Sequence, residues 1–277
     1  MRSMLLILDG SREGQGSIQL AVRWARRFGA RVSALGWVDE HALAAPEPAP
    51  IGGDAFKDRR DRSLLEQAHR RVDEALTRFS REAESAGIAF SAGTQVGERI
   101  AGLSAAAQPH DVVIISRDTH FTGPDEYETD GTWALLSGHC ARPLVVVPPE
   151  IQAGAGNLIA YSGGMRAAHA LQTLVANDLH QGVPNHVLSI HGSSMDIATD
   201  RARRGLEFLE AHGGQAFLLP VVTHEAVADV LIEHARRLGV ELVVMGSHPR
   251  SWLTSYLIGS IPHEVLSQSG CPVFVTV

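Results

Sequence analysis

A segment near the carboxyl end of the chain combines residue types that bind anions. It runs from Gly246 to Ser260, contains no carboxylate, and carries one arginine, one histidine and five serine or threonine hydroxyls. Glycines near both ends allow a ligand to approach the backbone closely, and the segment leads into a helical stretch whose free N–H groups and dipole favour an anion. The pattern predicts a phosphate-binding loop, whose candidate residues are Gly246, Ser247, His248, Arg250, Gly259, Ser260 and Ile261.

Short apolar runs divide the chain and place this loop. They lie at residues 4–8, 112–115, 144–147, 158–161, 242–245 and 273–275, with weaker runs at 32–38, 88–96, 187–191 and 216–220. Runs of this length, rich in Val and Ile and apolar on both faces, are typical of buried parallel strands. Between them, residues 65–83, 167–179 and 227–238 repeat apolar side chains at helical spacing. The alternation predicts an α/β fold, in which ligands lie beyond the carboxyl ends of the strands.

The pattern of strands and helices occurs twice along the chain. Residues 8–11 correspond to 161–164, residues 111–116 to 241–246, and residues 142–147 to 271–276. The first half is the longer one, and we place its insertion in a loop at residues 42–56, which are rich in Pro and Gly. We predict two domains, at residues 1–149 and 156–277, joined by a linker that contains Pro and Gly.

The loop and the last strand resemble those of the universal stress protein family. Loops of that family have the pattern Gly-x2-Gly-x9-Gly-Ser/Thr, and its members often end Cys-Pro-Val-x-Val-x. Here Gly246, Pro249 and Gly259-Ser260 follow the spacing, and the chain ends with the residues Cys-Pro-Val-Phe-Val-Thr-Val at 271–277. The first strand of each half resembles the family's Val-Asp-Gly-Ser opening. The resemblance covers nearly the whole chain, twice, and is that of a tandem member.

The resemblance implies two flavodoxin-like open parallel sheets of the adenine nucleotide alpha hydrolase type. Each is expected to have five strands in the order 3-2-1-4-5, and the halves are expected to pack as an intrachain pseudo-dimer through their last strands. The resemblance also implies an ATP or AMP site, with adenine near Tyr161 and Ser162 and phosphates in the glycine loop. In the first half, Asp9 holds the family's acidic position. Whether two chains also associate as a homodimer stays open.

Both halves depart from the family pattern. In the second half, Ser162 replaces the acidic residue and Pro249 replaces a glycine, although proline has no N–H to donate. Losing two hydrogen bonds to a charged group costs about 3–6 kcal/mol, which Arg250 can partly offset by bidentate phosphate contacts. In the first half, residues 116–130 lack the glycines and carry five carboxylates that repel phosphate. We therefore expect the nucleotide in the second half.

Composition excludes several other classes of protein. The chain has 277 residues, 44% apolar and 20% charged, with a formal charge of −7. These values indicate a folded globular protein and argue against nonspecific binding to nucleic acid or to an acidic membrane. Two cysteines form neither a disulfide framework nor a thiolate zinc cluster, and no apolar run is long enough for a membrane span. We expect a cytoplasmic protein.

Three functional hypotheses follow from the sequence. The first is a stress-response regulator that binds ATP or AMP through its second half. The second is a universal stress protein that binds no nucleotide and acts as an interaction or scaffold module. The third is a weak ATP hydrolase, but the chain has no phosphate-loop motif, nucleophile elbow or zinc-hydrolase histidine pair. We favour the first hypothesis, and we predict no catalytic residue and no metal ligand.

Overall fold

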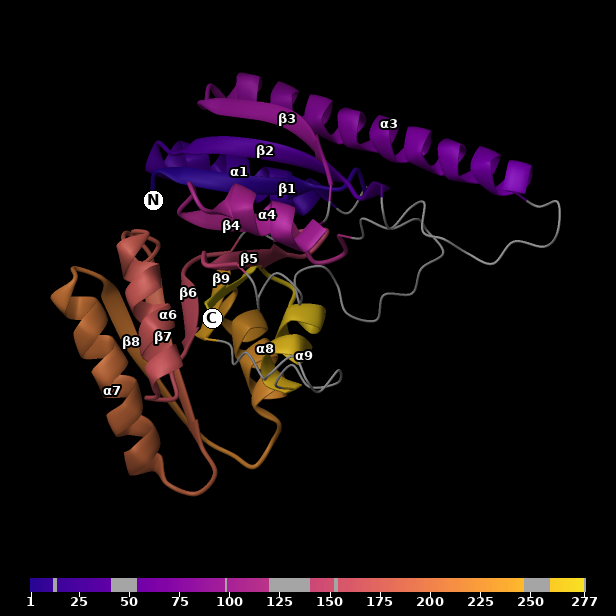
Figure 1. Cartoon of the computed structure of the whole chain (residues 1–277). Coiled ribbons are helices and arrows are strands. Elements are labelled where there is room, and N and C mark those ends of the chain that lie inside the picture. Colours follow the sequence, from indigo (N-terminus) through magenta and orange to yellow (C-terminus); the bar gives the residue numbers. More distant parts are fainter. Residues whose placement is uncertain are drawn as a thin grey trace. The chain divides into compact units, whose positions relative to one another are not determined.

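Two sets of alternating strands and helices follow the repeat in the sequence (Figure 1). The computed structural model describes residues 1–11, 14–40, 54–97, 99–119, 140–151, 154–246 and 260–276. By their contacts, the residues divide into a first unit, Arg2–Ala141, and a second unit, Arg142–Val277 together with Met1. Of the candidate site residues, Ser247, His248, Arg250 and Gly259 lie outside the described ranges.

The first unit contains a parallel sheet with the strand order β3-β2-β1-β4. Its elements are β1 (Ser3–Leu8), α1 (Gln15–Phe28), β2 (Arg31–Val38), α3 (Asp54–Ala86), β3 (Phe90–Val96), α4 (Arg99–Ala107) and β4 (Val112–Ser116). The central strands β1 and β4 are buried almost throughout, as their uninterrupted apolar sequences predict. The register pairs Leu6 of β1 with Ile114 of β4.

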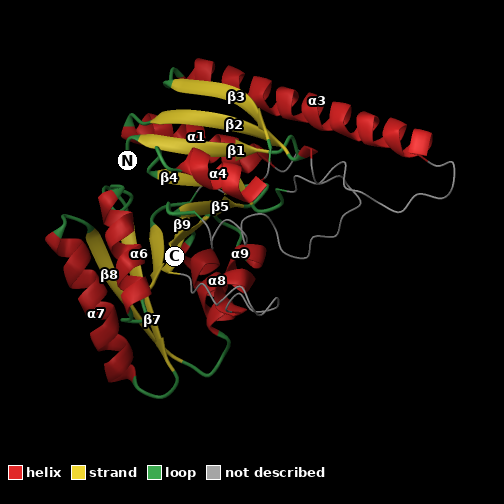
Figure 2. Ribbon diagram, in the orientation of Figure 1, coloured by secondary structure: helices red, strands yellow, loops and turns green. Residues whose placement is uncertain are grey.

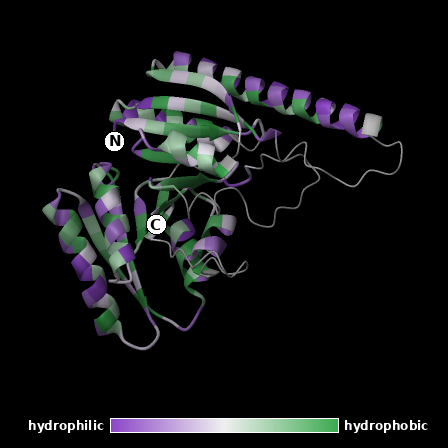
Figure 3. Cartoon of the chain, viewed as in Figure 1, coloured by the Kyte–Doolittle hydropathy of each residue, from purple (hydrophilic) through white to green (hydrophobic). Residues whose placement is uncertain are grey.

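The helix α3 is the longest element, with 33 residues. The predicted stripe is confirmed, because Ala68, Val72, Leu76, Phe79 and Ala83 are all buried. The helix packs against β2 and β3, whereas hydrophilic residues predominate along its amino-terminal half (Figure 3). It begins at Asp54, so the loop predicted at residues 42–56 ends earlier than expected.

The second unit contains a mixed sheet with the strand order β5-β10-β9-β6-β7-β8. Its elements are β5 (Leu144–Val147), β6 (Asn157–Ala160), α6 (Met165–Ala176), β7 (Pro184–His191), α7 (Met195–Ala211), β8 (Gln215–Val222), α8 (Val227–Leu238), β9 (Leu242–Gly246), α9 (Ser260–Gln268) and β10 (Val273–Thr276). Five of the strands are parallel, and β5 pairs with β10 in the antiparallel sense. The helices α6 and α7 lie on one face of this sheet, and α8 and α9 lie on the other (Figure 2).

The prediction of two separate five-stranded sheets is wrong. The strands follow one order through a ten-stranded mixed sheet, and β5, the last strand of the first half, belongs to the second unit. The pairing of the two last strands that the resemblance implies is present, with Val145 opposite Phe274. All four residues of each strand are buried. Because β5 pairs with β10, the compact units divide at residue 141, before the predicted linker.

Within the described ranges, no helix is both long enough and apolar enough to cross a lipid bilayer.

We predict that Phe79→Ala lowers the free energy of unfolding by about 3–5 kcal/mol, because it leaves a cavity in the core. The Phe79 side chain is fully buried and meets the Phe90 ring edge-on, with 5.5 Å between the ring centroids. Phe56→Ala is the matched control on the same helix, since Phe56 is 72% exposed. Urea unfolding followed by tryptophan fluorescence measures both. Equal stability losses in the two variants would contradict the assigned core.

Candidate functional site

A cavity of about 450 Å³ opens in the second unit at the carboxyl ends of β6, β7 and β9. In the sheet order, β6 lies between β9 and β7, so the chain leaves neighbouring strands in opposite directions at this point. Ligand sites of open α/β sheets occur at such reversals of strand order. The described residues that line the cavity are Ala160, Tyr161, Ser162, Arg166, Ala167, Leu188, Ile190, Val227, Leu231, Met245, Gly246, Ile261 and Pro262.

A glycine turn after β6 brings the first polar groups to the cavity. Gly163 has a φ of 78°, which residues with a side chain rarely adopt. The turn leads into α6, whose first residues place Arg166 and Ala167 on the cavity wall. The Ser162 hydroxyl accepts a hydrogen bond from the Gly164 N–H at 3.4 Å. Gly10 has a φ of 79° in the corresponding turn of the first unit, which supports the proposed repeat.

Gly246 allows the end of β9 to pack directly against the start of α6. A Cβ atom at this position would lie 2.5 Å from the Arg166 carbonyl oxygen and 2.7 Å from its carbonyl carbon. Backbone atoms cannot yield as the end of a flexible side chain can, so only glycine fits without a shift of the helix. The sequence indicates that Gly246 lets a ligand approach, and the structure gives this glycine a packing role as well.

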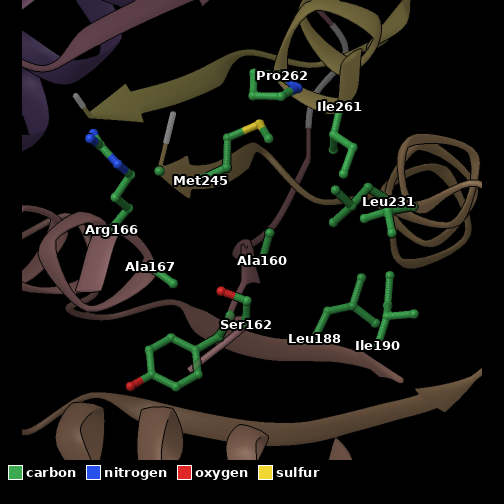
Figure 4. A pocket seen from close by; sticks show the side chains of 13 residues that line it. Ala160, Ser162, Arg166, Ala167, Leu188, Ile190, Leu231, Met245, Ile261 and Pro262 are labelled. Atoms are coloured by element: carbon green, nitrogen blue, oxygen red, sulfur yellow. The ribbon is translucent and has the colours of Figure 1, made fainter. Parts of the chain in front are cut away.

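The cavity has an apolar side and a cationic side (Figure 4). Leu188, Ile190 and Leu231 gather on one side, whereas Arg166 extends on the other. Ser162 points towards the space between them. Among the described residues that line the cavity, Arg166 is the one with a formal charge, and none is a carboxylate or a histidine. This arrangement suits a ligand that has a flat or apolar part and a separate anionic part.

Tyr161 contributes to the cavity wall but is held mainly by packing. The residue is 9% exposed, and its ring lies against Gly205 of α7, where an added Cβ would be 3.3 Å from Cγ. Its N–H donates to the Leu188 carbonyl at 2.8 Å. These contacts fix the strand end from which Ser162 continues.

The structure brings together four of the predicted site residues: Tyr161, Ser162, Gly246 and Ile261 all line the cavity. Ser260 begins α9 beside them. Sequence reasoning missed Arg166, and it also missed the apolar wall that β7, α8 and Pro262 provide. The signal for Arg166 was its place directly after the glycine turn, at the start of a helix.

The Asp9 candidate lies in the first unit, away from this cavity's lining. One of its carboxylate oxygens accepts a hydrogen bond from the Ser11 N–H at 2.9 Å. At the end of β4, Ser116 is buried where the second unit has Gly246. Arg117 forms an ion pair with Asp118, with 3.6 Å between Nε and Oδ1. Residues 120–130, which carry the other four carboxylates of the predicted acidic loop, lie outside the described ranges.

The described residues contain no cluster of three or more His, Cys, Asp or Glu side chains arranged to hold a metal ion. Cys271, which precedes β10, is half-buried, and its partial removal from water raises the pKa of its thiol. A raised pKa keeps the group in its less reactive protonated form at neutral pH. We assign it a packing role.

Fold and cavity together describe an α/β protein built from two similar units, with a cavity at the carboxyl ends of the strands of the second unit. A model of the universal stress protein family matches residues 142–276. Over 99% of both chains, the protein is 22% identical to universal stress protein Slr1230 of Synechocystis. Universal stress protein YxiE of Bacillus subtilis is 30% identical over 98 residues, which are 34% of this chain and 62% of that protein.

Solved structures agree on the fold. A universal stress protein from Archaeoglobus fulgidus superposes with a TM-score of 0.72 over 99% of this chain and 95% of that chain, at 16% identity. A putative universal stress protein from Pseudomonas aeruginosa gives a TM-score of 0.60 over 100% and 93%, at 18% identity. The second half of the chain thus matches the universal stress protein family, and the chain as a whole is similar to a universal stress protein of the same length and shares the fold of solved structures with that name.

We predict that Gly246→Ala destabilises the second unit by about 1–3 kcal/mol, because the new methyl group overlaps the Arg166 backbone and forces α6 away. Gly270→Ala is the matched control, since a Cβ there meets no atom within 4 Å. Thermal and urea unfolding followed by circular dichroism measure the two variants side by side. A fully stable Gly246→Ala variant would show that this close approach is not needed.

Proposed function

We propose that the second unit binds an adenine nucleotide, ATP or AMP, and that the protein is a cytoplasmic stress-response regulator acting through this binding. The observation that carries the proposal is the convergence of both flanks of the predicted phosphate loop on one cavity. Gly246 is the first residue of the segment and Ile261 directly follows its last, and both line the cavity together with Ser162. A loop anchored at these two points has its ends at the cavity.

The size and lining of the cavity support a nucleotide. Small-molecule sites typically occupy about 300–1,000 Å³ and combine apolar walls with a few polar groups. At about 450 Å³, this cavity falls in that range. Leu188, Ile190 and Leu231 offer an apolar surface for a base, and the Arg166 guanidinium offers paired N–H donors for phosphate oxygens.

Binding without turnover fits the described lining best. Hydrolysis of a phosphate anhydride needs a group that orients or deprotonates water, usually a carboxylate or a histidine. No described residue of the cavity wall carries either group. We therefore propose a regulator that binds a nucleotide without hydrolysing it. The proposed cytoplasmic location is supported by the two cysteines, which are both free thiols.

We predict that the protein binds ATP or AMP and that Arg166→Gln weakens this binding about 10- to 100-fold, because a charged hydrogen bond is lost. Isothermal titration calorimetry with each nucleotide measures the affinity. Arg237→Gln is the matched control, since Arg237 is an exposed arginine of α8 in the same unit and is absent from the cavity wall. It is expected to bind as the unchanged protein does.

Two results would contradict the nucleotide proposal. One is the absence of heat at millimolar ATP and AMP, together with no ultraviolet-absorbing compound released after acid precipitation of the purified protein. The other is equal binding by the Arg166 and Arg237 variants, which would contradict the assignment of the nucleotide to this cavity. The first result would favour the alternative that this family member is an interaction or scaffold module.

We also predict that incubation with ATP releases phosphate no faster than a buffer blank, since the described cavity wall offers no general base. A coupled phosphate assay at saturating ATP measures this directly. Release above the blank that disappears in Arg166→Gln, but persists in Arg237→Gln, would instead favour the weak hydrolase.

A further inference from the structure

The apolar wall of the cavity continues onto the neighbouring strand. Leu188 and Ile190 of β7 lie on the apolar side of the cavity (Figure 4). In the sheet register, Leu188 pairs with Leu219 of β8, and Ile190 pairs with Val221. Side chains of residues paired in this way point to the same face of a parallel sheet. The wall therefore extends beyond the cavity by one strand spacing, about 4.8 Å.

A stack of two rings lengthens this surface along the strands. His186 of β7 pairs in register with Phe217 of β8, and their rings stack with 5.4 Å between the centroids. Partial burial lowers the pKa of His186, so its ring is neutral at pH 7. Phe217 is 41% exposed, and Leu219 and Val221 are half-buried. We call the side chains of His186, Phe217, Leu219 and Val221 the β8 strip.

The β8 strip lies on the face of the sheet that leads into the cavity. The opposite face is covered by α7, where a Cβ added at Gly205 would lie 2.9 Å from Cγ1 of Val187. On the face of the strip, α8 packs against α9 and β6, and β8 is the last strand in the sheet order. The strip is thus an apolar surface that is partly exposed at one end and joins the cavity wall.

The first unit has polar residues at the equivalent edge. Its edge strand β3 pairs with β2, and α3 covers one face of this pair, where a Cβ added at Gly36 would meet the helix. Gly36 pairs with Thr94, so the alternate residues Ser91, Gly93 and Gln95 point to the other face. All three are exposed. Polar edges of this kind need no partner, so the apolar edge of the second unit indicates that something covers it.

The size of the β8 strip fits an alkyl chain better than a protein. From Phe217 to Val221 the strip is about 13 Å long, and its two strands are about 10 Å wide. A standard protein interface buries about 800 Å² on each partner, several times this area. The described lining of the adjoining cavity carries one cationic side chain and no carboxylate, which favours an anionic head group.

We propose that the second unit binds a medium-chain fatty acid, with the alkyl chain along the β8 strip and the carboxylate in the cavity. This ligand goes beyond the nucleotide proposal and does not depend on it. A fatty acid and a nucleotide would compete, because both use Leu188 and Ile190.

Calorimetry with sodium dodecanoate, below its critical micelle concentration and without nucleotide, tests the proposal. We expect binding whose affinity rises from octanoate to dodecanoate, by up to about fourfold for each added methylene. Phe217→Ser should weaken dodecanoate binding about tenfold, because it removes the largest apolar contact of the chain.

Leu218→Ser is the matched control. Leu218 is 39% exposed, close to the value for Phe217, but it pairs with Val187 and therefore points to the face that α7 covers. This variant should keep the full affinity, and circular dichroism checks that both variants fold.

Three results would overturn the fatty-acid proposal. They are no binding by the unchanged protein, an affinity independent of chain length, and equal weakening in the Phe217 and Leu218 variants. Light scattering examines the other occupant of the strip, since a dimer that Phe217→Ser dissociates would assign the strip to a second copy of the chain instead. Because no nucleotide is present, none of these results bears on the nucleotide proposal.

Discussion

The contact between Gly246 and the backbone of Arg166 is the constraint on which the cavity depends. The end of β9 and the first turn of α6 approach so closely that an added Cβ would lie 2.5 Å from the Arg166 carbonyl oxygen. This approach sets where α6 begins beside the sheet, and therefore where Arg166 and Ala167 meet the cavity. It also fixes the point from which the loop after β9 departs. In the sequence, Gly246 indicates a place where a ligand can approach the backbone. In the structure, the same glycine is also required for the packing of β9 against α6.

The two units have diverged in opposite ways around the same turn. Both keep a glycine with φ near 80°, and both place an arginine against it. The first unit keeps Asp9 but has an acidic segment after its fourth strand, whereas the second has Ser162 and a segment free of carboxylates. Electrostatics therefore favours anions at the second turn and disfavours them at the first. A duplicated fold can specialise in this way, because the strands that hold each turn are buried while the turn residues are free to change.

Sequence periodicity predicted the elements well because burial leaves a strong pattern. The runs at 112–115 and 242–245 became β4 and β9, and the stripe at 65–83 became part of α3. The carboxyl ends of such strands indicated where to search for a site, the composition of the loop after β9 indicated Gly246, and the family resemblance indicated Tyr161. Neither the strand pattern nor the resemblance indicated Arg166, because in the sequence a single arginine at the start of a helix cannot be distinguished from an arginine exposed to solvent. The apolar wall from β7 and α8 is assembled by tertiary packing, which no local pattern encodes.

The pairing of β5 with β10 was implied by the family resemblance, whereas periodicity alone could not predict it. Four buried residues, Leu144–Val147, read as the last strand of their own half, and periodicity cannot tell which neighbour a strand will choose. An apolar last strand left at the edge of a sheet would expose unpaired N–H and C=O groups. In the antiparallel pairing of β5 with β10, Val146 lies opposite Val273, and the N–H and C=O groups along the two facing edges can bond to each other. All four residues of each strand are buried. The chain therefore contains within itself the strand pairing that covers these two apolar edges.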